Sequence, residues 1–420
     1  MQSTLLKFNR FMSNFSTKLV GGFVPIIVYK YAPSNKMFLA ILTCALQYLL
    51  SYVFDKILNK QLVKKSQLFL FLRLFPVALY EILLLFVDIS PMLCAIGIGV
   101  GYSLSYVFKN IPTEVLFAYN NAKNTQGTGV KLSISKFIDQ SAMILGTILG
   151  GYALDFWDLK MLIIISLVLY FIGSLPMLIY YFAHIKDSNL NEEYSTYAHI
   201  VLKERSIDKK NANLVSSKIS NIYKKFYFFQ ESYNAIYILM PLLLFVITGK
   251  FTYSAYAGAI FDGVMGISTY LFGKLEHKKD ITILSIIGGI MLGVMAVCLT
   301  LLNDNFIWLF YILVALIAMG YSASYIFMYN RMLVKSKIVG RNTTAIINKI
   351  NMYFLSTFFV VSFGLFLPLQ VCFYVAGGMS IVAGVASPRV EELTRRILVD
   401  HLEDNEIKED YKIFSFKRKQ

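Results

Sequence analysis

Cysteine and histidine are rare in this chain, with four of each among 420 residues. The cysteines fall within predicted helices, far apart and without the spacing of metal ligands, so we interpret them as packing residues: Cys44, Cys94, Cys298 and Cys372. The histidines lie in predicted loops or at helix margins: His184, His199, His277 and His401. This distribution argues against an intramembrane enzyme that uses a histidine base or a bound metal. We therefore expect no enzyme activity, no metal and no cofactor.

Charged residues are also few, at 15% of the chain, whereas 57% is hydrophobic and the mean hydropathy is +0.59. A water-soluble domain of this size cannot hide so much apolar surface. The phosphate-binding pattern G-x-x-x-x-G-K-[ST] is missing, which argues against ATP-driven pumping. The net charge of +15 belongs to no separable basic domain, so we expect membrane lipids and no nucleic acid as partners.

Long apolar runs make up most of the chain. Runs of about 20 residues have the length of a helix that crosses hydrocarbon. There are twelve, six in each half: 12–32, 37–57, 67–88, 91–109, 131–153, 160–183, 228–249, 253–273, 281–302, 306–329, 342–366 and 368–386. The sequence therefore predicts an all-α integral membrane protein with twelve transmembrane helices.

An internal repeat relates the two halves. GYSLSYVF at 101–108 returns as GYSASYIF at 320–327, and YVFDKI at 52–57 returns as YLFGKL at 270–275. An even number of crossings in each copy means that both enter the membrane in the same direction, as parallel six-helix repeats.

Basic residues set the expected orientation. With both termini cytoplasmic, the inner loops and tails hold 32 Lys or Arg residues, while the outer loops hold four: Lys30, Lys36, Lys160 and Lys250. This is the bias of the positive-inside rule, and no cleavage site follows the first apolar run.

We expect an N-terminal bundle at 1–183, a cytoplasmic linker at 184–226, a C-terminal bundle at 227–386 and a cytoplasmic tail at 387–420. Part of that tail has the pattern of a short amphipathic helix, which leaves open a plain tail, a membrane-surface helix or a partner-binding helix.

This organisation resembles the major facilitator superfamily of secondary transporters. The resemblance covers residues 1–386, and its motifs are partial. The loops after the second and eighth helices, FDKILNKQLVKK and FGKLEHKKD, keep the superfamily's charge pattern through Asp55, Lys56, Gly273 and Lys274, which are candidate gating residues. GTILGG at 146–151 resembles the GPxxGG core of the antiporter branch and favours export. The arginine common in the fourth helix of proton-coupled exporters is missing.

Ionisable residues inside predicted helices are candidates for substrate binding or proton coupling, because an unpaired charge there is costly. Lys136 and Asp139 share one face of the fifth helix, and Lys349 occupies the equivalent position of the eleventh. The fifth and eighth helices of the superfamily approach each other, as do the second and eleventh. The resemblance therefore implies that Asp262 faces Lys136 and Asp139. A transport role and a permanent structural ion pair both remain open.

Two further acids belong to this candidate set. Glu81 fits a pair with Arg73, burial as a neutral acid, or a role in transport. Glu231, like Lys18 and Arg73, lies close enough to an inner helix end to be interfacial instead.

Tyrosines and amides are candidate cavity-lining residues. The repeated segment places Tyr102 with Tyr106, and Tyr321 with Tyr325, each pair one turn apart on a helix that lines the cavity in the superfamily. Close helix packing is the alternative explanation. The first and seventh helices carry polar inner ends before Pro25 and Pro241, with further candidates in Asn14, Lys18 and Asn234. Either these helices bend and line the cavity, or they start later and the polar residues are in water.

The sequence thus predicts a monomeric, multi-pass plasma-membrane transporter of a small solute. It would work by alternating access, with protons as a candidate coupling ion and export as the favoured direction. The alternative is a protein of the same fold that no longer transports and acts as a sensor, immunity factor or scaffold.

Overall fold

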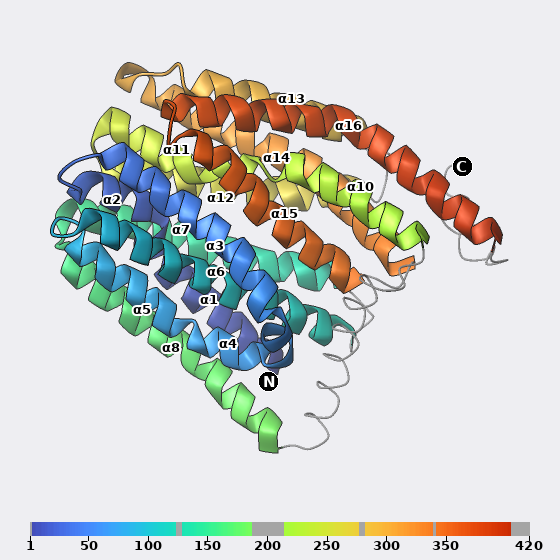
Figure 1. The fold of residues 1–420 in the computed structure, drawn as a ribbon, viewed down its shortest axis with the longest axis horizontal. Helices are drawn as coiled ribbons and strands as arrows, with labels where there is room; N and C mark the ends of the chain where they lie inside the picture. The colour runs from blue at the N-terminus through green and yellow to red at the C-terminus, as the bar shows by residue number, and fades with distance from the viewer. Residues whose placement is uncertain (1, 123–127, 187–213, 277–281, 339–341, 405–420) are drawn as a thin grey trace.

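The computed structural model describes residues 2–122, 128–186, 214–276, 282–338 and 342–404. Within those ranges the regular structure is entirely helical, with no strand, and the helices form two adjacent bundles (Figure 1). The first bundle contains α1 (Gln2–Val20), α2 (Val24–Tyr31), α3 (Lys36–Lys64), α4 (Ser66–Leu72), α5 (Leu74–Leu83), α6 (Pro91–Ala122), α7 (Thr128–Phe156) and α8 (Leu159–Lys186). The second contains α10 (Leu214–Gln230), α11 (Tyr233–Thr248), α12 (Phe251–Glu276), α13 (Thr282–Leu299), α14 (Ile307–Ile338), α15 (Asn342–Phe363) and α16 (Leu369–Asp404).

These helices correspond to the twelve predicted crossings, three of which are interrupted. The first crossing is α1 and α2 joined by the short 3-10 turn Gly21–Phe23, the third is α4 and α5, and the seventh is α10 and α11. Eight crossings of the described chain are long and apolar enough to span a membrane, and α13 has a shorter apolar stretch. The other three, α7, α12 and α15, carry the polar site residues Asp139, Asp262 and Lys349.

The predicted bends at Pro25 and Pro241 have different outcomes. The first crossing does break beside Pro25, at the turn Gly21–Phe23. In the seventh crossing, Pro241 stays inside the continuous helix α11, and the break lies earlier, between Gln230 and Tyr233. The hydroxyl of Ser254 donates to the carbonyl oxygen of Pro241 at 2.8 Å. A side chain of α12 therefore satisfies a backbone acceptor of α11 beside the proline.

Glycines set the closest helix contacts of the first bundle. A Cβ on Gly146 would meet the carbonyl of Phe15, and one on Gly150 would meet the carbonyl of Leu19. The GTILGG segment is therefore a seam along which α7 packs on α1. Gly151 similarly approaches Ala255 of the second bundle.

Contacts between the bundles follow the expected pairing, because α7 packs on α12 and α3 packs on α15. One hydrophobic core is shared by both bundles and includes Phe23, Phe245 and Phe251. A second core belongs to the first bundle except for α15 residues such as Phe354, and a third lies wholly in the second bundle. Among the described residues, the bundles thus share a core at the end that holds the short loops and have largely separate cores toward the end that holds the long ones.

The last helix differs from its predicted extent. The sequence ended the twelfth crossing at residue 386, whereas α16 continues through Pro388 to Asp404. Proline cannot donate to the carbonyl four residues earlier. Here the hydroxyl of Ser387 donates to that carbonyl, of Gly384, at 2.8 Å, so the helix continues without an unsatisfied acceptor. Leu398 of the extension is fully buried in the third core with Tyr227 of α10.

Candidate functional site

Polar residues of α1 begin the site. Arg10, Asn14 and Lys18 recur every four residues and so share one face of the helix. Asn14 is buried, and Arg10 and Lys18 are partly buried. Their partners come from α6, α7, α11 and α12, so this face points toward the centre of the molecule.

The first cluster lies around Asp139. Its carboxylate forms an ion pair with Arg10 and accepts a hydrogen bond from the amide of Asn14 at 3.1 Å. The oxygen of the same amide accepts from the ammonium of Lys109, on α6, at 2.6 Å. The side chains of Arg10 and Asp139 remain 17% and 16% exposed, so water or a solute can reach this pair. The side chain of Lys136 lies outside the described residues.

The second cluster joins the two bundles. Lys18 of α1 lies 3.7 Å from the carboxylate of Asp262 on α12 and hydrogen-bonds the hydroxyl of Tyr237 on α11. Tyr237 in turn donates to Asp262 at 3.1 Å. Asp262 is fully buried. Among the described side chains its cationic partner is Lys18, and the expected contact with Lys136 and Asp139 of α7 stays a prediction.

The third cluster is built around Lys349 in the second bundle. Its ammonium lies 2.9 Å from the carboxylate of Glu231, which is only 1% exposed and also accepts from Asn234 at 3.0 Å. The rings of Tyr325, Tyr329 and Tyr227 surround the same ammonium at 4.7, 5.5 and 5.9 Å from their centroids. An ammonium over aromatic faces is attracted by their quadrupoles. Glu231 is thus an interior acid and not an interfacial one.

We refer to these three clusters together as the central network: Arg10, Asn14, Lys18, Lys109, Asp139, Glu231, Asn234, Tyr237, Asp262 and Lys349. Sequence reasoning missed Arg10, Lys109 and Tyr237. The four-residue spacing of α1 was a signal for Arg10, and Lys109 follows Tyr106 by three residues on the same face of α6. No local pattern singled out Tyr237, whose role depends on packing between helices.

The repeated tyrosines divide into packed and accessible positions. Tyr102 is buried and donates to the carbonyl of Gly21 at 2.8 Å, and Tyr321 is buried and stacks on Tyr233 at 3.6 Å between ring centroids. These two hold helices together. Tyr106 and Tyr325 are partly buried beside them and retain surface that a solute can contact.

Arg73 and Glu81 lie in the interior of the first bundle, and no ion pair joins them among the described residues. Arg73 donates to the hydroxyls of Ser105 and Thr17 at 3.0 and 3.2 Å. Glu81 accepts from the hydroxyl of Ser166 at 2.9 Å. Both are almost completely buried, so they are closed to a solute in this conformation.

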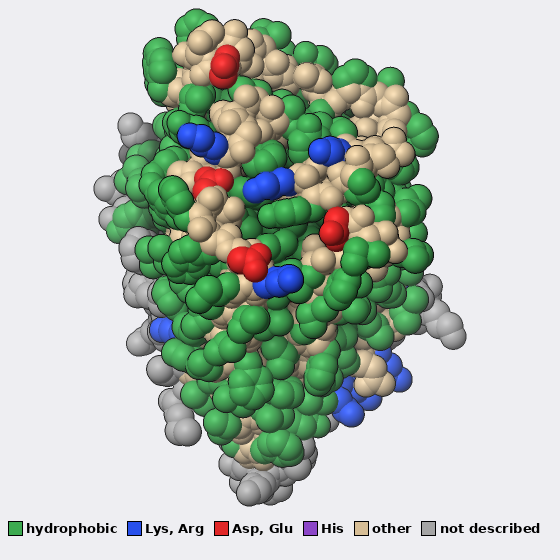
Figure 2. Space-filling model, turned by 90° about the vertical axis from the view of Figure 1, so that its left-hand side faces the viewer, with side chains coloured by type: hydrophobic (Ala, Val, Ile, Leu, Met, Phe, Trp, Pro, Cys, Tyr) green, Lys and Arg blue, Asp and Glu red, His purple; other side chains and the backbone are tan. Residues whose placement is uncertain are grey.

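The short-loop end closes the molecule between the bundles. Asp155, at the end of α7, accepts from the backbone N–H groups of Phe251 and Thr252 at 3.1 and 2.8 Å and from the hydroxyl of Thr252 at 2.5 Å. A carboxylate stabilises the positive N-terminal end of a helix, here α12. Phe251 also packs edge-on against Phe23 of the first bundle. Figure 2 shows this end, where hydrophobic side chains predominate and charged ones are few and scattered.

The candidate gating residues lie at the opposite end. Asp55 is fully buried near the end of α3, and the neighbouring Lys56 is exposed. On α12, Gly273 has open space where a side chain would project, and the side chain of Lys274 lies outside the described residues.

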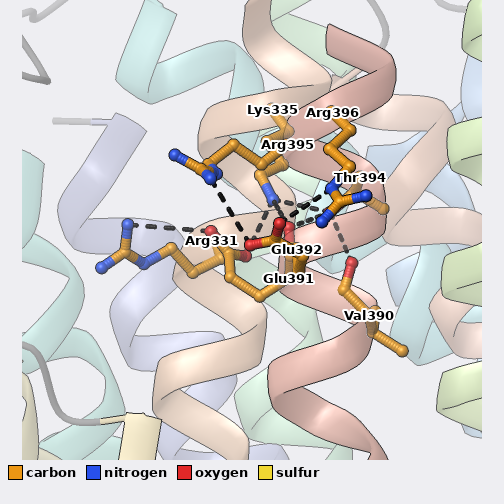
Figure 3. A network of polar contacts seen from close by, with 8 residues as sticks. All are labelled: Arg331, Lys335, Val390, Glu391, Glu392, Thr394, Arg395 and Arg396. Atoms are coloured by element: carbon orange, nitrogen blue, oxygen red, sulfur yellow. Dashed lines mark hydrogen bonds and ion pairs between the residues drawn. The ribbon is translucent and has the colours of Figure 1, made fainter. Parts of the chain in front are cut away.

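An ion cluster fixes the extension of α16 to α14 (Figure 3). Glu391 accepts from Lys335 at 2.8 Å and lies 3.9 Å from Arg331, and Lys335 also donates to the hydroxyl of Thr394 at 2.6 Å. Burial lowers the pKa of Lys335, and the carboxylate of Glu391 opposes that shift. The segment after residue 386 is therefore packed onto the second bundle as far as Leu398.

The site holds no candidate metal cluster within the described ranges, since no three His, Cys, Asp or Glu residues there converge. Comparison with known proteins gives no matching family model and no matching curated protein. Solved structures do match along nearly the whole chain.

Three of these matches are membrane transporters. The crystal structure of a D-xylose–proton symporter has 12% sequence identity and a TM-score of 0.63, covering 91% of this chain and 96% of the symporter. A bacterial homologue of the iron transporter ferroportin, in an inward-facing state, has 13% identity and a TM-score of 0.66, covering 93% and 98%. The inward-open xylose transporter XylE from E. coli has 13% identity and a TM-score of 0.60, covering 91% and 94%. The chain therefore has the fold of the major facilitator superfamily and is a multi-pass membrane protein.

Proposed function

We propose that the protein is a secondary transporter that moves a small solute by alternating access. The observation that carries the proposal is the ion pair of Lys18 with buried Asp262, which joins the bundles at the centre of a transporter fold. A charged pair between two moving bodies is stable in one arrangement and separated in another, so it can bias the equilibrium between them. The fully buried carboxylate makes breaking this pair costly unless a proton or a ligand compensates.

The arrangement of the cores suggests which state the molecule occupies. The bundles share a core and the Asp155 contact at the short-loop end, whereas the described residues toward the other end form largely separate cores. With the short loops outside, as the basic residues indicate, this is an outward-closed state. The charged cluster around Asp139 then faces the cytoplasm.

Protons are the coupling ion that we propose, acting at Asp139 and Asp262. Protonation of either carboxylate would weaken its ion pair and release Arg10 or Lys18. The proposed location is the plasma membrane with both termini cytoplasmic, the protein is a monomer, and export is the proposed direction on the resemblance of GTILGG.

A stability screen followed by a flux assay tests this proposal. Purified protein in nanodiscs would be heated with a broad solute library at acidic and neutral pH, since a ligand of the native state raises the melting temperature. Stabilising solutes would then be added to proteoliposomes that contain a pH-sensitive dye. We expect solute-dependent proton movement that Asp262→Asn removes and the exposed-site control Glu392→Gln retains. Binding without any flux would contradict transport and favour a sensor or scaffold.

A further inference from the structure

The central network has one more cation than acid among the described side chains. Three ion pairs account for all three acids: Arg10 with Asp139, Lys18 with Asp262, and Lys349 with Glu231. Lys109 is the remaining cation, and among the described residues its one hydrogen-bond partner is the neutral amide oxygen of Asn14 at 2.6 Å. The network therefore carries a surplus of one positive charge.

No other acid among the described side chains forms an ion pair with Lys109. Arg73 and Glu81 are a cation and an acid in the interior of the same bundle, so Glu81 can at most balance Arg73. Both are held by hydroxyl groups and are nearly inaccessible, as described above. Lys136 lies one turn before Asp139 on α7, and as a further lysine it could only add positive charge.

The position of Lys109 also suits a binding group. It lies four residues before Thr113, where the apolar span of α6 ends, or about 6 Å along the helix axis. It is partly buried, and the adjacent Arg10–Asp139 pair retains some exposure. A desolvated ammonium that has only a neutral partner gains most from a charged acceptor, because charge-assisted hydrogen bonds are shorter and stronger than neutral ones.

Aromatic residues lie one turn from Lys109 on the same face of α6. Tyr106 lies one turn before Lys109 on the same face of α6 and is partly buried. Its neighbours Tyr102 and Tyr48 pack against it at 5.6 and 6.0 Å between ring centroids. A cation beside an apolar aromatic wall matches a ligand with one negative charge and an apolar body.

We propose that the transported solute is an amphipathic organic monoanion, a carboxylate in the simplest case, whose charged group binds Lys109 and whose apolar body contacts Tyr106. This inference rests on the proposed transport function and specifies its substrate class. Asn14 links the anion subsite to Asp139, because its oxygen accepts from Lys109 and its amide N–H donates to Asp139. A proton on Asp139 would free the guanidinium of Arg10 as a second cation for the anion. Binding of the carboxylate and of the proton would then support each other.

Matched ligand series test the charge preference directly. Each series keeps one apolar body and changes the polar group: benzoate, benzylamine and benzyl alcohol; octanoate, octylamine and octanol; indole acetate, tryptamine and tryptophol. Melting temperatures in nanodiscs would be recorded at acidic and neutral pH. We expect stabilisation by carboxylates in at least one series, with tighter binding at the acidic pH.

Two variants with opposite expected effects distinguish a binding role from a structural one. Lys109→Gln should weaken binding of that carboxylate by roughly 10- to 100-fold, the range for loss of a charged hydrogen bond, and Lys109→Arg should restore most of it. Asp139→Asn should strengthen binding at neutral pH and remove its pH dependence, because it imitates the protonated acid. Lys60→Gln, an exposed lysine on α3 outside the network, is the matched control and should bind as the unmodified protein does.

The outcomes separate the two proposals. Stabilisation by amines or alcohols with coupled proton flux would overturn the anion subsite and leave the transport function standing. Carboxylate binding that is unchanged in Lys109→Gln would also overturn it. If Lys109→Gln does not fold, the response of Asp139→Asn decides, and unchanged affinity and pH dependence there would refute the subsite. No carboxylate response in any series counts against the anion subsite, and no ligand of any class together with no proton flux counts against transport as well.

Discussion

Removing either partner of the ion pair between Glu231 and Lys349 should lower the free energy of unfolding, and removing Lys349 should lower it more. The two effects should not be additive. The carboxylate is 1% exposed and the ammonium 15% exposed, and they are 2.9 Å apart. Lys349→Gln leaves a buried carboxylate whose remaining partner is Asn234. Breaking a buried pair in this way costs about 3–5 kcal/mol in the free energy of unfolding.

Removing the acid of the pair should lower the free energy of unfolding by less than removing the lysine. In Glu231→Gln, the ammonium of Lys349 keeps some exposure to water and the three tyrosine rings around it. Each such contact is worth about 0.5–2 kcal/mol, so we expect a loss of about 1–2 kcal/mol. The double variant removes both charges and should be less destabilised than the sum, with a coupling energy on the order of 2–3 kcal/mol.

A double-mutant cycle measures these terms. Unfolding would be followed by circular dichroism in mixed micelles as the denaturing detergent is increased. The control cycle uses Glu392 and Arg396, an exposed pair 2.8 Å apart on α16, where we expect at most about 0.5 kcal/mol of coupling. Additive effects at Glu231 and Lys349, or a larger loss in Glu231→Gln than in Lys349→Gln, would refute this reasoning.

Two further predictions concern the ends of the molecule. Asp155→Asn should weaken the outward-closed state by about 2 kcal/mol, because a charged acceptor of three hydrogen bonds becomes neutral. A cysteine placed at buried Ala255 would then react roughly thirtyfold faster with a membrane-impermeant thiol reagent, and an unchanged rate would contradict the role of this contact. At the other end, Glu391→Gln should loosen the extension of α16, because Lys335 loses its carboxylate partner. Limited proteolysis of the extension should then be about tenfold faster, as expected for a loss near 1.4 kcal/mol, whereas Glu392→Gln, at an exposed position, should leave the rate unchanged.

The sequence was sufficient for the architecture because hydrocarbon imposes helices of a fixed length, and repetition reveals the second copy. It also identified the acids of the central network, since a charge within an apolar run is visible without a structure. The partners were harder to predict. Asp262 was expected to face Lys136 and Asp139 of α7, and α12 does pack on α7, but no sequence pattern assigned Lys18 of α1 to Asp262 as its ion-pair partner.

Local chemistry explains the other differences. Pro388 predicts the end of a helix, because proline has no N–H donor. The hydroxyl of Ser387 takes the place of that donor, and the helix continues. Arg10 precedes the apolar run that marked the first crossing, so it was counted with the cytoplasmic tail. Lys109 stands at the end of a predicted helix, where a lysine ordinarily reaches water, and only the contact with Asn14 identifies it as part of the network.

The most direct test of the central claim measures both ends of the molecule in one sample. Spin labels would be placed on exposed positions across the bundles, at Ser34 and Asn305 near the short loops and at Lys64 and Lys218 near the long ones, with the four native cysteines replaced. Distance distributions in nanodiscs would be recorded by pulsed electron paramagnetic resonance at acidic and neutral pH. Alternating access predicts two populations at each end, with one distance lengthening as the other shortens when the pH changes. A single unchanging distribution at both ends, with a stabilising ligand also present, would contradict it.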